Sequence, residues 1–398
     1  MTTPRIDRLL VLAALSLVGL GIVMVYSATG LAFGAERLGS HVTSIAVGLA
    51  LAALLFRIGP DRLRRLVIPM LIGVIALLAL TALTPLGASA GGARRWLRIG
   101  PLQIQPAEIA KLMLVIYLAH ILAKKRERIR QFLVGFLPPV AITSIAVVLL
   151  LRQPDFGNAV IVVLLLAILL FVAGTKLNYL FLSLLVAAPV AYALITQSSY
   201  RFSRLKAFLD PWQHRQDDAY QVFQSLVSFG KGGLWGVGVG AGHQKLGFVP
   251  EAHNDFILAM VGEELGLVGV VVTVALFALI VWRGLRIARR EQDPFRMLLA
   301  VGLSTAVGLG AAINCGVVLA LLPTKGLPLP LVSYGGSAMV ATLGALGVLL
   351  RIGADQLRES SMPSVGARET PSRESRSFES VGVLTHPSVG AHGPLGGT

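Results

Sequence analysis

Charged residues and cysteine are scarce in this chain of 398 residues. Asp, Glu, Lys and Arg make up 14% of it, against about 25% in soluble proteins, so a single soluble globular fold is excluded. Hydrophobic residues make up 55% of the chain. This excludes disorder for most of its length, because disordered segments have low hydrophobicity. The single cysteine, Cys315, excludes a disulfide framework and a cysteine-based zinc site. Acidic residues number 20 against 35 basic ones, which gives a net charge of +15 and points to nucleic acid or membrane.

Long apolar segments decide between these two partners. A helix crosses a bilayer with about 20 mostly apolar residues, and these segments lack the alternation typical of strands. They predict an all-α polytopic membrane protein with ten transmembrane helices, and nucleic acid is not expected as a partner. The ten segments lie near residues 9–26, 41–56, 66–84, 107–123, 132–151, 157–175, 177–197, 256–282, 297–322 and 328–350.

The distribution of Lys and Arg predicts the orientation. With the N-terminus inside, 22 of the 35 basic residues fall in inside segments, 12 fall outside and Lys111 lies within a helix. Positive charge gathers on the cytoplasmic side, so both termini are predicted to be cytoplasmic. Residues 1–353 are then the membrane domain, and residues 354–398, poor in apolar side chains, are predicted to be a disordered cytoplasmic tail.

The predicted outside loops hold most of the chemically specific residues. A loop of about 60 residues separates the seventh and eighth segments, and loops of that length are usually functional or structured. Within it, residues 200–205 and 220–229 mix apolar and polar side chains as interfacial helices do. The other informative loops read GGARRWLRIGPLQIQPAEIAK (91–111), RQPDFG (152–157) and LPTKGLPLPLVSYGGS (322–337), and the long loop ends in GHQKLGFVPEAHNDF (242–256).

Glu108 and Lys111 are ionisable residues inside the fourth apolar segment. Spaced at i and i+3, they share a helix face and can pair. One interpretation is a salt bridge that lets the helix tolerate two charges. The other is that ionisable residues within the membrane mark a substrate pathway. The two interpretations are compatible.

Asp255 directly precedes the eighth segment, beside His253 and Asn254. An Asp before an apolar run is commonly an N-cap. However, Asp255 ends the longest outside loop and shares its predicted side with Glu108 and Lys111. A carboxylate bordering apolar surroundings can have the raised basicity that a general base requires. Both readings remain open at this point. Of the adjacent Glu263 and Glu264, at least one is expected to be structural.

Five motifs in order and spacing resemble the SEDS family (shape, elongation, division and sporulation) of bacterial peptidoglycan polymerases. The resemblance covers residues 7–353 and is closer to the division branch than to the elongation branch, on YRFSRLKAFLDPW (200–212), PEAHNDF and LPTKG. Two departures, Asn254 for Thr and Ala107 for Ser, remove no ionisable group. The matching motifs are GARRWLRIGPLQIQPAEIAKL, QPDFGNAV, SLVSFGKGGLWGVGVG, QKLGFVPEAHNDFILAMVGEELG and LPTKGLPLPLVSYGGS.

The resemblance implies polymerisation of lipid II outside the cytoplasmic membrane, at the division septum, with a class B penicillin-binding transpeptidase and other division proteins as partners. It implies that Asp255 is the general base and that Lys111, oriented by Glu108, is the first candidate, before Arg201, Arg204 and Lys325, for stabilising the charge on the leaving pyrophosphate. The undecaprenyl pyrophosphate leaving group needs cations or a divalent metal, Mg or Mn, whose ligands are unknown. The residues expected to contact the substrate are Arg201, Arg204, Lys325, Arg152, Asp155 and His253.

Three alternatives remain. A lipid II flippase would need a polar path across the membrane, which the uncharged middles of most segments argue against. A scaffold that only recruits the transpeptidase would leave the outside charges dispensable. An elongation-type polymerase that maintains cell shape differs from the division type only in the motifs above.

Overall fold

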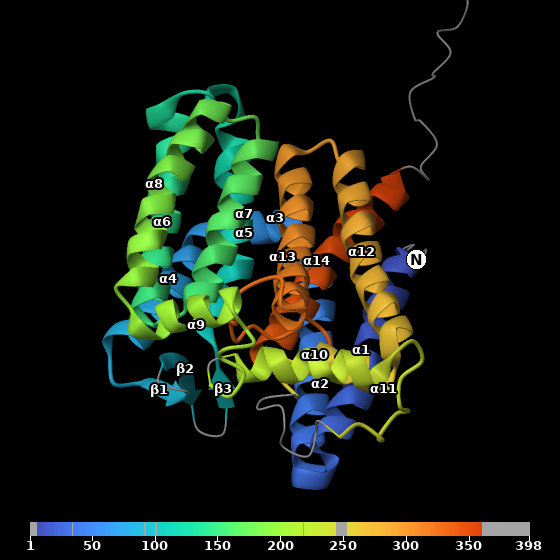
Figure 1. Cartoon of the computed structure of the whole chain (residues 1–398). Helices are drawn as coiled ribbons and strands as arrows, with labels where there is room; N and C mark the ends of the chain where they lie inside the picture. Colours follow the sequence, from blue (N-terminus) through green and yellow to red (C-terminus); the bar gives the residue numbers. More distant parts are fainter. Residues whose placement is uncertain are drawn as a thin grey trace, which may run out of the picture. The chain divides into compact units, whose positions relative to one another are not determined.

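Long helices running side by side form most of the molecule (Figure 1). The computed structural model describes residues 6–33, 35–90, 93–99, 102–217, 219–243 and 253–359. Residues 244–252 of the motif before Asp255, and the predicted tail from residue 360 onward, lie outside the described residues. The helices are α1 (Arg8–Phe33), α2 (Ala35–Ile58), α3 (Pro60–Arg65), α4 (Val67–Leu83), α5 (Pro106–Lys124), η1 (Arg126–Arg128), η2 (Phe132–Phe136), α6 (Leu137–Arg152), α7 (Phe156–Val172), α8 (Leu177–Thr196), α9 (Ser199–Leu209), α10 (Tyr220–Gly232), α11 (Ile257–Glu264), α12 (Gly266–Arg290), α13 (Pro294–Val318) and α14 (Gly336–Glu359).

Eight helical spans in the described part are long and apolar enough to cross a membrane. Two further apolar helices, α4 and α7, have 17 residues each. Each of the ten predicted segments overlaps one of these helices, but several boundaries differ, with α1 and α12 ending later and α2 beginning earlier than predicted. The predicted 256–282 segment is split into α11 and α12, the last helix begins at Gly336 rather than near 328, and α14 continues to Glu359, beyond the predicted domain end at 353.

The split between α11 and α12 lies at Gly266, whose φ is +67°. Backbone packs directly against it, because a Cβ at this position would lie 2.4 Å from the Gly236 nitrogen. Left-handed backbone and such a close approach together require glycine. The glycine-rich residues 236–242 therefore support the helix break.

Residues 327–333 are mostly buried without being helical. Leu327, Leu329, Leu331 and Val332 are each at most 4% exposed. Pro328 and Pro330 lack the N–H donors that a helix needs, which explains why α14 begins later than predicted. Buried irregular backbone is tolerated where the protein satisfies its polar groups, as the Ser333 hydroxyl does by accepting from the Leu329 N–H.

A small antiparallel sheet corrects the all-α prediction. It consists of β1 (Gly87–Ala90), β2 (Ala93–Ile99) and β3 (Leu102–Ile104), in the order β1-β2-β3. In strand β2, Leu97 is buried, Arg94 and Arg98 are exposed, and Arg95 and Trp96 are intermediate. The sequence did not predict this sheet, because its strands are short and lie within a loop between long apolar segments.

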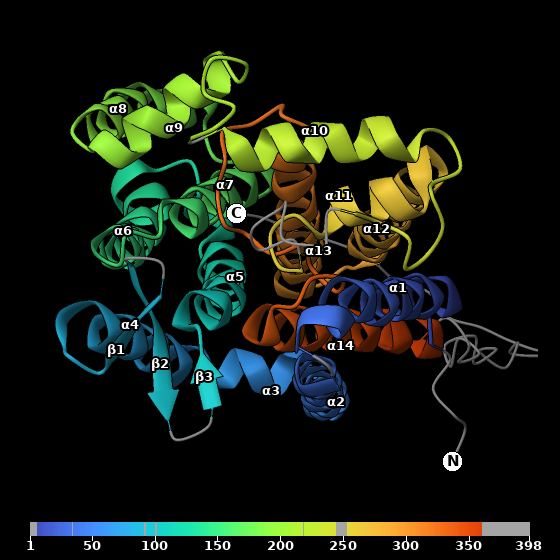
Figure 2. The same ribbon diagram turned by 60° about the horizontal axis from the view of Figure 1, so that its bottom comes forward.

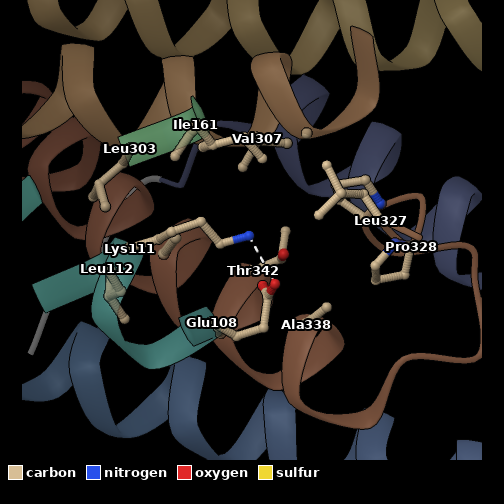
Figure 3. A pocket seen from close by; sticks show the side chains of 15 residues that line it. Glu108, Lys111, Leu112, Ile161, Leu303, Val307, Leu327, Pro328, Ala338 and Thr342 are labelled. Atoms are coloured by element: carbon tan, nitrogen blue, oxygen red, sulfur yellow. Dashed lines mark hydrogen bonds and ion pairs between the residues drawn. The ribbon is translucent and has the colours of Figure 1, made fainter. Parts of the chain in front are cut away.

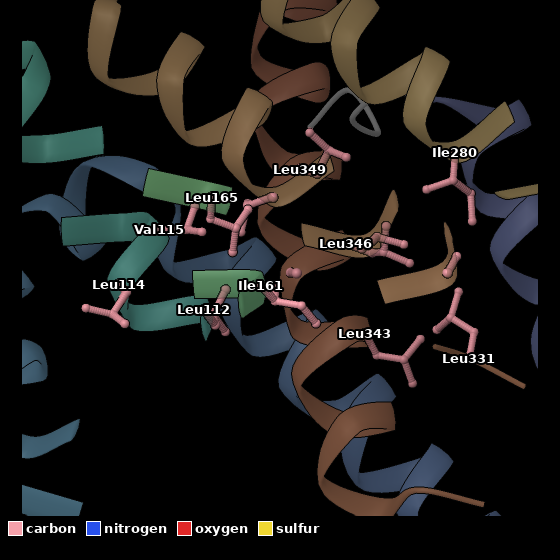
Figure 4. Packing of buried hydrophobic residues seen from close by; sticks show 14 of the residues in the cluster. Leu112, Leu114, Val115, Ile161, Leu165, Ile280, Leu331, Leu343, Leu346 and Leu349 are labelled. Carbon is pink, nitrogen blue, oxygen red and sulfur yellow. The ribbon is translucent and has the colours of Figure 1, made fainter. Parts of the chain in front are cut away.

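Buried Leu, Val and Ile side chains from α5, α7, α12 and α14 form the centre of the bundle (Figure 4). Lipid tails are as apolar as these side chains, so close packing rather than transfer from water stabilises membrane helices. The contact of α2 with α14 shows this packing, because a Cβ on Gly347 would lie 2.3 Å from the Ala52 carbonyl oxygen. By contrast, α8 has no buried residue.

The two ends of the bundle differ. The sheet, α9 and α10 lie at one end, and α9 and α10 run across the long helices there (Figures 1 and 2). Together with residues 319–335 they make up what we call the loop-rich end. The opposite end carries α3, the turn between α12 and α13, and the C-terminal part of α14, and we call it the ion-pair end.

Candidate active site

Glu108 and Lys111 form the predicted ion pair in the first turns of α5. The Lys111 Nζ and Glu108 Oε1 atoms lie 2.8 Å apart, and the side chains are 16% and 5% exposed. Burying two charges is tolerated when they pair with good geometry. Figure 3 shows the two side chains pointing toward each other, with Thr342 of α14 beside them.

This pair lies in a cavity at the meeting point of α5, α7, α13, α14 and residues 319–335. The cavity holds about 570 Å³ of space, counting the solvent at its mouth. Apart from the ion pair and Thr342, apolar side chains and backbone line it, including Leu327 and Pro328 (Figure 3). An apolar cavity with one charged pair suits a ligand that is mostly hydrocarbon and carries a polar group.

Asp255 lies in the turn before α11, next to the loop that closes this cavity. A Cβ on Gly326 would be 2.7 Å from Asp255 Oδ2, so the carboxylate rests against that glycine. The next residue, Leu327, lines the cavity, but Asp255 itself does not. Asp255 is not the N-cap residue of α11, because Phe256 occupies that position.

A second group of predicted residues surrounds the Phe156 ring at the start of α7. The Lys325 Nζ lies 4.1 Å from the ring centroid, and the Arg201 guanidinium carbon lies 5.7 Å from it. Cations over an aromatic face are attracted by its negative quadrupole. Burial lowers the pKa of Lys325 to about 8, with the Asp155 carboxylate opposing the shift and Arg201 adding to it.

Three other predicted residues occupy distinct positions around this group. Arg204 of α9 donates to the Thr324 carbonyl oxygen at 3.1 Å and faces the Tyr200 ring. Asp155 is the N-cap of α7 and accepts from the Asn158 N–H and side-chain amide, so it has a structural role. Arg152, the last residue of α6, is exposed.

His253 is held by residues that the sequence did not single out. Arg37 of α2 approaches its Nε2 to 2.6 Å, and the Tyr334 ring lies 5.7 Å from the imidazole. The Tyr334 N–H also donates to the His253 carbonyl oxygen at 3.0 Å. One feature of the sequence could have indicated Arg37, because it is a basic residue on the predicted outside, where basic residues are few.

Glu263 and Glu264 are fully buried and structural, as expected for at least one of them. Glu264 accepts from the Ser27 hydroxyl and the Gly240 N–H, and Glu263 accepts from the His243 N–H. These bonds fasten the glycine-rich segment to the end of α11.

The described residues offer no cluster of three or more His, Cys, Asp or Glu side chains able to hold a metal ion. Among the described residues near Asp255, no three protein ligands for Mg or Mn therefore come together.

Comparison with known proteins places the chain in a family. The family model described as "Cell cycle protein", covering FtsW, RodA and SpoVE, matches residues 7–357. The chain belongs to this family. It is a mostly helical, polytopic integral membrane protein.

Individual relatives agree with this assignment. The chain is 40% identical over 357 residues to the "Probable peptidoglycan glycosyltransferase FtsW" of Geobacter sulfurreducens, covering 87% of this chain and 95% of the relative. The Legionella pneumophila protein of the same name is 42% identical over 325 residues, covering 81% of this chain and 82% of the relative.

Two solved structures share the fold. One is a chain from a peptidoglycan synthase complex that coordinates polymerization and crosslinking, with a TM-score of 0.75, 31% identity and coverage of 88% of this chain and 98% of that one. The rod shape determining protein RodA of Thermus thermophilus has a TM-score of 0.67 and 31% identity, with coverage of 88% and 97%.

Proposed function

We propose that this protein is a peptidoglycan glycosyltransferase that polymerises lipid II for septal cell-wall synthesis in cell division. The observation that carries the proposal is the match over 87% of the chain to relatives named as FtsW glycosyltransferases. The grouping of Asp255, Glu108, Lys111, Arg201 and Lys325 around one loop supports it.

In this proposal the chain crosses the cytoplasmic membrane ten times, and the loop-rich end is extracytoplasmic. The eight long apolar spans and the shorter α4 and α7 supply the ten crossings. The excess of Lys and Arg on the other side supports the orientation. A reporter fused after residue 398 should be active only in the cytoplasm, and periplasmic activity would contradict this topology.

The reaction joins two lipid-linked sugars. Asp255 accepts the proton of the acceptor's 4-hydroxyl while that oxygen attacks the anomeric carbon of the donor. The bond from that carbon to the pyrophosphate oxygen breaks, and the pyrophosphate leaves on its undecaprenyl chain. Lys325, Arg201 and Arg204 stabilise the charge that develops on it. Below pH 8 Lys325 is mostly protonated and can act in this way.

The Glu108–Lys111 cavity is proposed to hold the part of a substrate at which lipid and polar groups meet. Lys111 can donate to a substrate oxygen, and Glu108 fixes its direction. The apolar wall of α7, α13 and α14 accommodates hydrocarbon. A class B penicillin-binding transpeptidase is the proposed partner, supported by the complex from which one similar chain comes.

The proposed function is tested by polymerisation of purified lipid II by the detergent-solubilised protein with its transpeptidase partner. Wild type should make glycan strands, and Asp255→Asn should lower the rate by at least about a hundredfold, because the base is lost. Asp210→Asn, at the end of α9, is the control and should remain active.

Equal product from wild type and Asp255→Asn would refute the catalytic role of Asp255. If wild type makes no polymer and vesicles containing it translocate lipid II, the protein is a flippase. If it does neither but still recruits the transpeptidase, it is a scaffold.

A further inference from the structure

Asn314 on α13 joins two segments that the reaction needs. Its side-chain Nδ2 lies 2.8 Å from the Asp255 carbonyl oxygen and 2.7 Å from the Leu327 carbonyl oxygen. Both partners can only accept, so the amide must present its nitrogen to them and uses both N–H donors. Asn314 is 2% exposed, and water therefore does not compete for these bonds.

Residues 325–327 reach three parts of the site. The Lys325 ammonium faces Phe156, Gly326 contacts the Asp255 carboxylate, and Leu327 lines the Glu108–Lys111 cavity. These residues have no helical or sheet hydrogen bonds to fix them. The Asn314 amide therefore fixes this loop relative to the turn that carries Asp255, with the Tyr334 N–H to the His253 carbonyl as a second tie.

We propose that Asn314 is a positioning residue for glycosyl transfer, which holds the Asp255 carboxylate against Gly326 and in register with Lys325. This inference rests on the proposed function and adds a residue outside the charged motifs. Leucine has nearly the same shape as asparagine but no donor. Asn314→Leu therefore releases both carbonyls without emptying the space, and the Asp255 turn can then shift relative to the loop.

The test compares Asn314→Leu with wild type in lipid II polymerisation across pH, with the full chain and its transpeptidase partner. Displacing a catalytic group by about 1 Å can cost a hundredfold in rate, so the rate should fall at least about tenfold. The acid limb of kcat/KM, which reports the base, should also move, because the Asp255 carboxylate leaves its position against Gly326. Loss of folded protein would lower the whole profile without moving this limb.

The matched control is Ser225→Ala. Ser225 is fully buried on α10. It donates one hydrogen bond, at 2.7 Å, to the carbonyl oxygen of Val318 on α13, the helix that carries Asn314. It should lose thermal stability without a shift of the acid limb. If Asn314→Leu does not fold, Asn314→Ala takes its place, since it also lacks the N–H donors and adds no titratable group.

The inference is overturned if the rate of the Asn314 variant stays within about twofold of the rate of Ser225→Ala. It is also overturned if kcat/KM falls at every pH without a shift of the acid limb. In that case wild type still polymerises lipid II and the proposed function stands. Absence of polymer from wild type overturns the proposed function and this inference with it.

Discussion

The two ends of the helical bundle use positive charge differently. At the ion-pair end, Arg296 lies within 4.0 Å of the carboxylates of Asp61, Asp293 and Asp355, and Arg351 pairs with Asp355. At the loop-rich end, Arg201, Arg204 and Lys325 face aromatic rings and carbonyl oxygens, and no carboxylate of the described residues lies within 4.0 Å of their nitrogens.

This difference distinguishes cations that stabilise the fold from cations that can bind a ligand. A cation that its own chain neutralises has little attraction left for a ligand. A partly buried cation without a close carboxylate gains from an anion, and a pyrophosphate supplies several oxygens. The comparison therefore predicts that charge changes at the loop-rich end affect the binding and reaction of the substrate, whereas those at the ion-pair end affect the stability of the protein.

The largest effect is expected at the Glu108–Lys111 pair, where both roles are combined. Lys111→Met leaves Glu108 buried without its partner, which should destabilise the protein by about 3–5 kcal/mol. Lys111→Met combined with Glu108→Gln removes both charges and should recover most of the melting temperature. If Lys111 acts on substrate, the double variant still loses at least about a hundredfold in polymerisation rate. A stable and fully active double variant would make the pair purely structural.

How far the sequence predicted this site depends on how local each contact is. Glu108 and Lys111 are three residues apart on one helix, so their pairing could be read directly and is confirmed. Asn314, Arg37 and Phe156 could not be found in this way. Asn314 contacts residues 59 and 13 positions away, and Arg37 contacts one 216 positions away. Each looks like an ordinary helix residue until the chain is folded.

The apolar segments were predicted well because a bilayer imposes one length and one composition. The errors lie where the membrane does not decide the structure. Residues 328–335 are apolar enough to look like part of a span, yet two prolines and the Ser333 hydroxyl, which accepts from the Leu329 N–H, hold them irregular. The roles of Arg152, Asp155 and His253 toward substrate stay predictions.

A smaller effect is expected from the titration of Lys325. Its pKa is lowered to about 8 by burial, so the ammonium is present below that pH and lost above it. Roughly one tenth remains charged one unit higher. The KM for lipid II should therefore rise several-fold between pH 7 and 9.

The control for this titration is available within the chain. Lys325→Arg keeps its charge throughout this range and should abolish the rise in KM. The matched variant Lys206→Arg changes an exposed lysine over the Phe202 ring, at 4.6 Å, and should leave the rise intact. A pH dependence that persists unchanged in Lys325→Arg would assign it to another group.

The smallest effect on activity is expected at the ion-pair end. Arg296→Met removes a side chain that is 18% exposed and lies near three carboxylates, one of which, on Asp61, is 59% exposed. Solvent screens such a network, so the loss should be about 1 kcal/mol of stability. Arg289→Met removes the same charge from an exposed position and should change neither property. The rate per folded molecule should match wild type in both variants, measured with lipid II beside a thermal melt. A fall in that rate for Arg296→Met alone would mean that the two ends are coupled through α13, and that charge at the ion-pair end also serves the reaction.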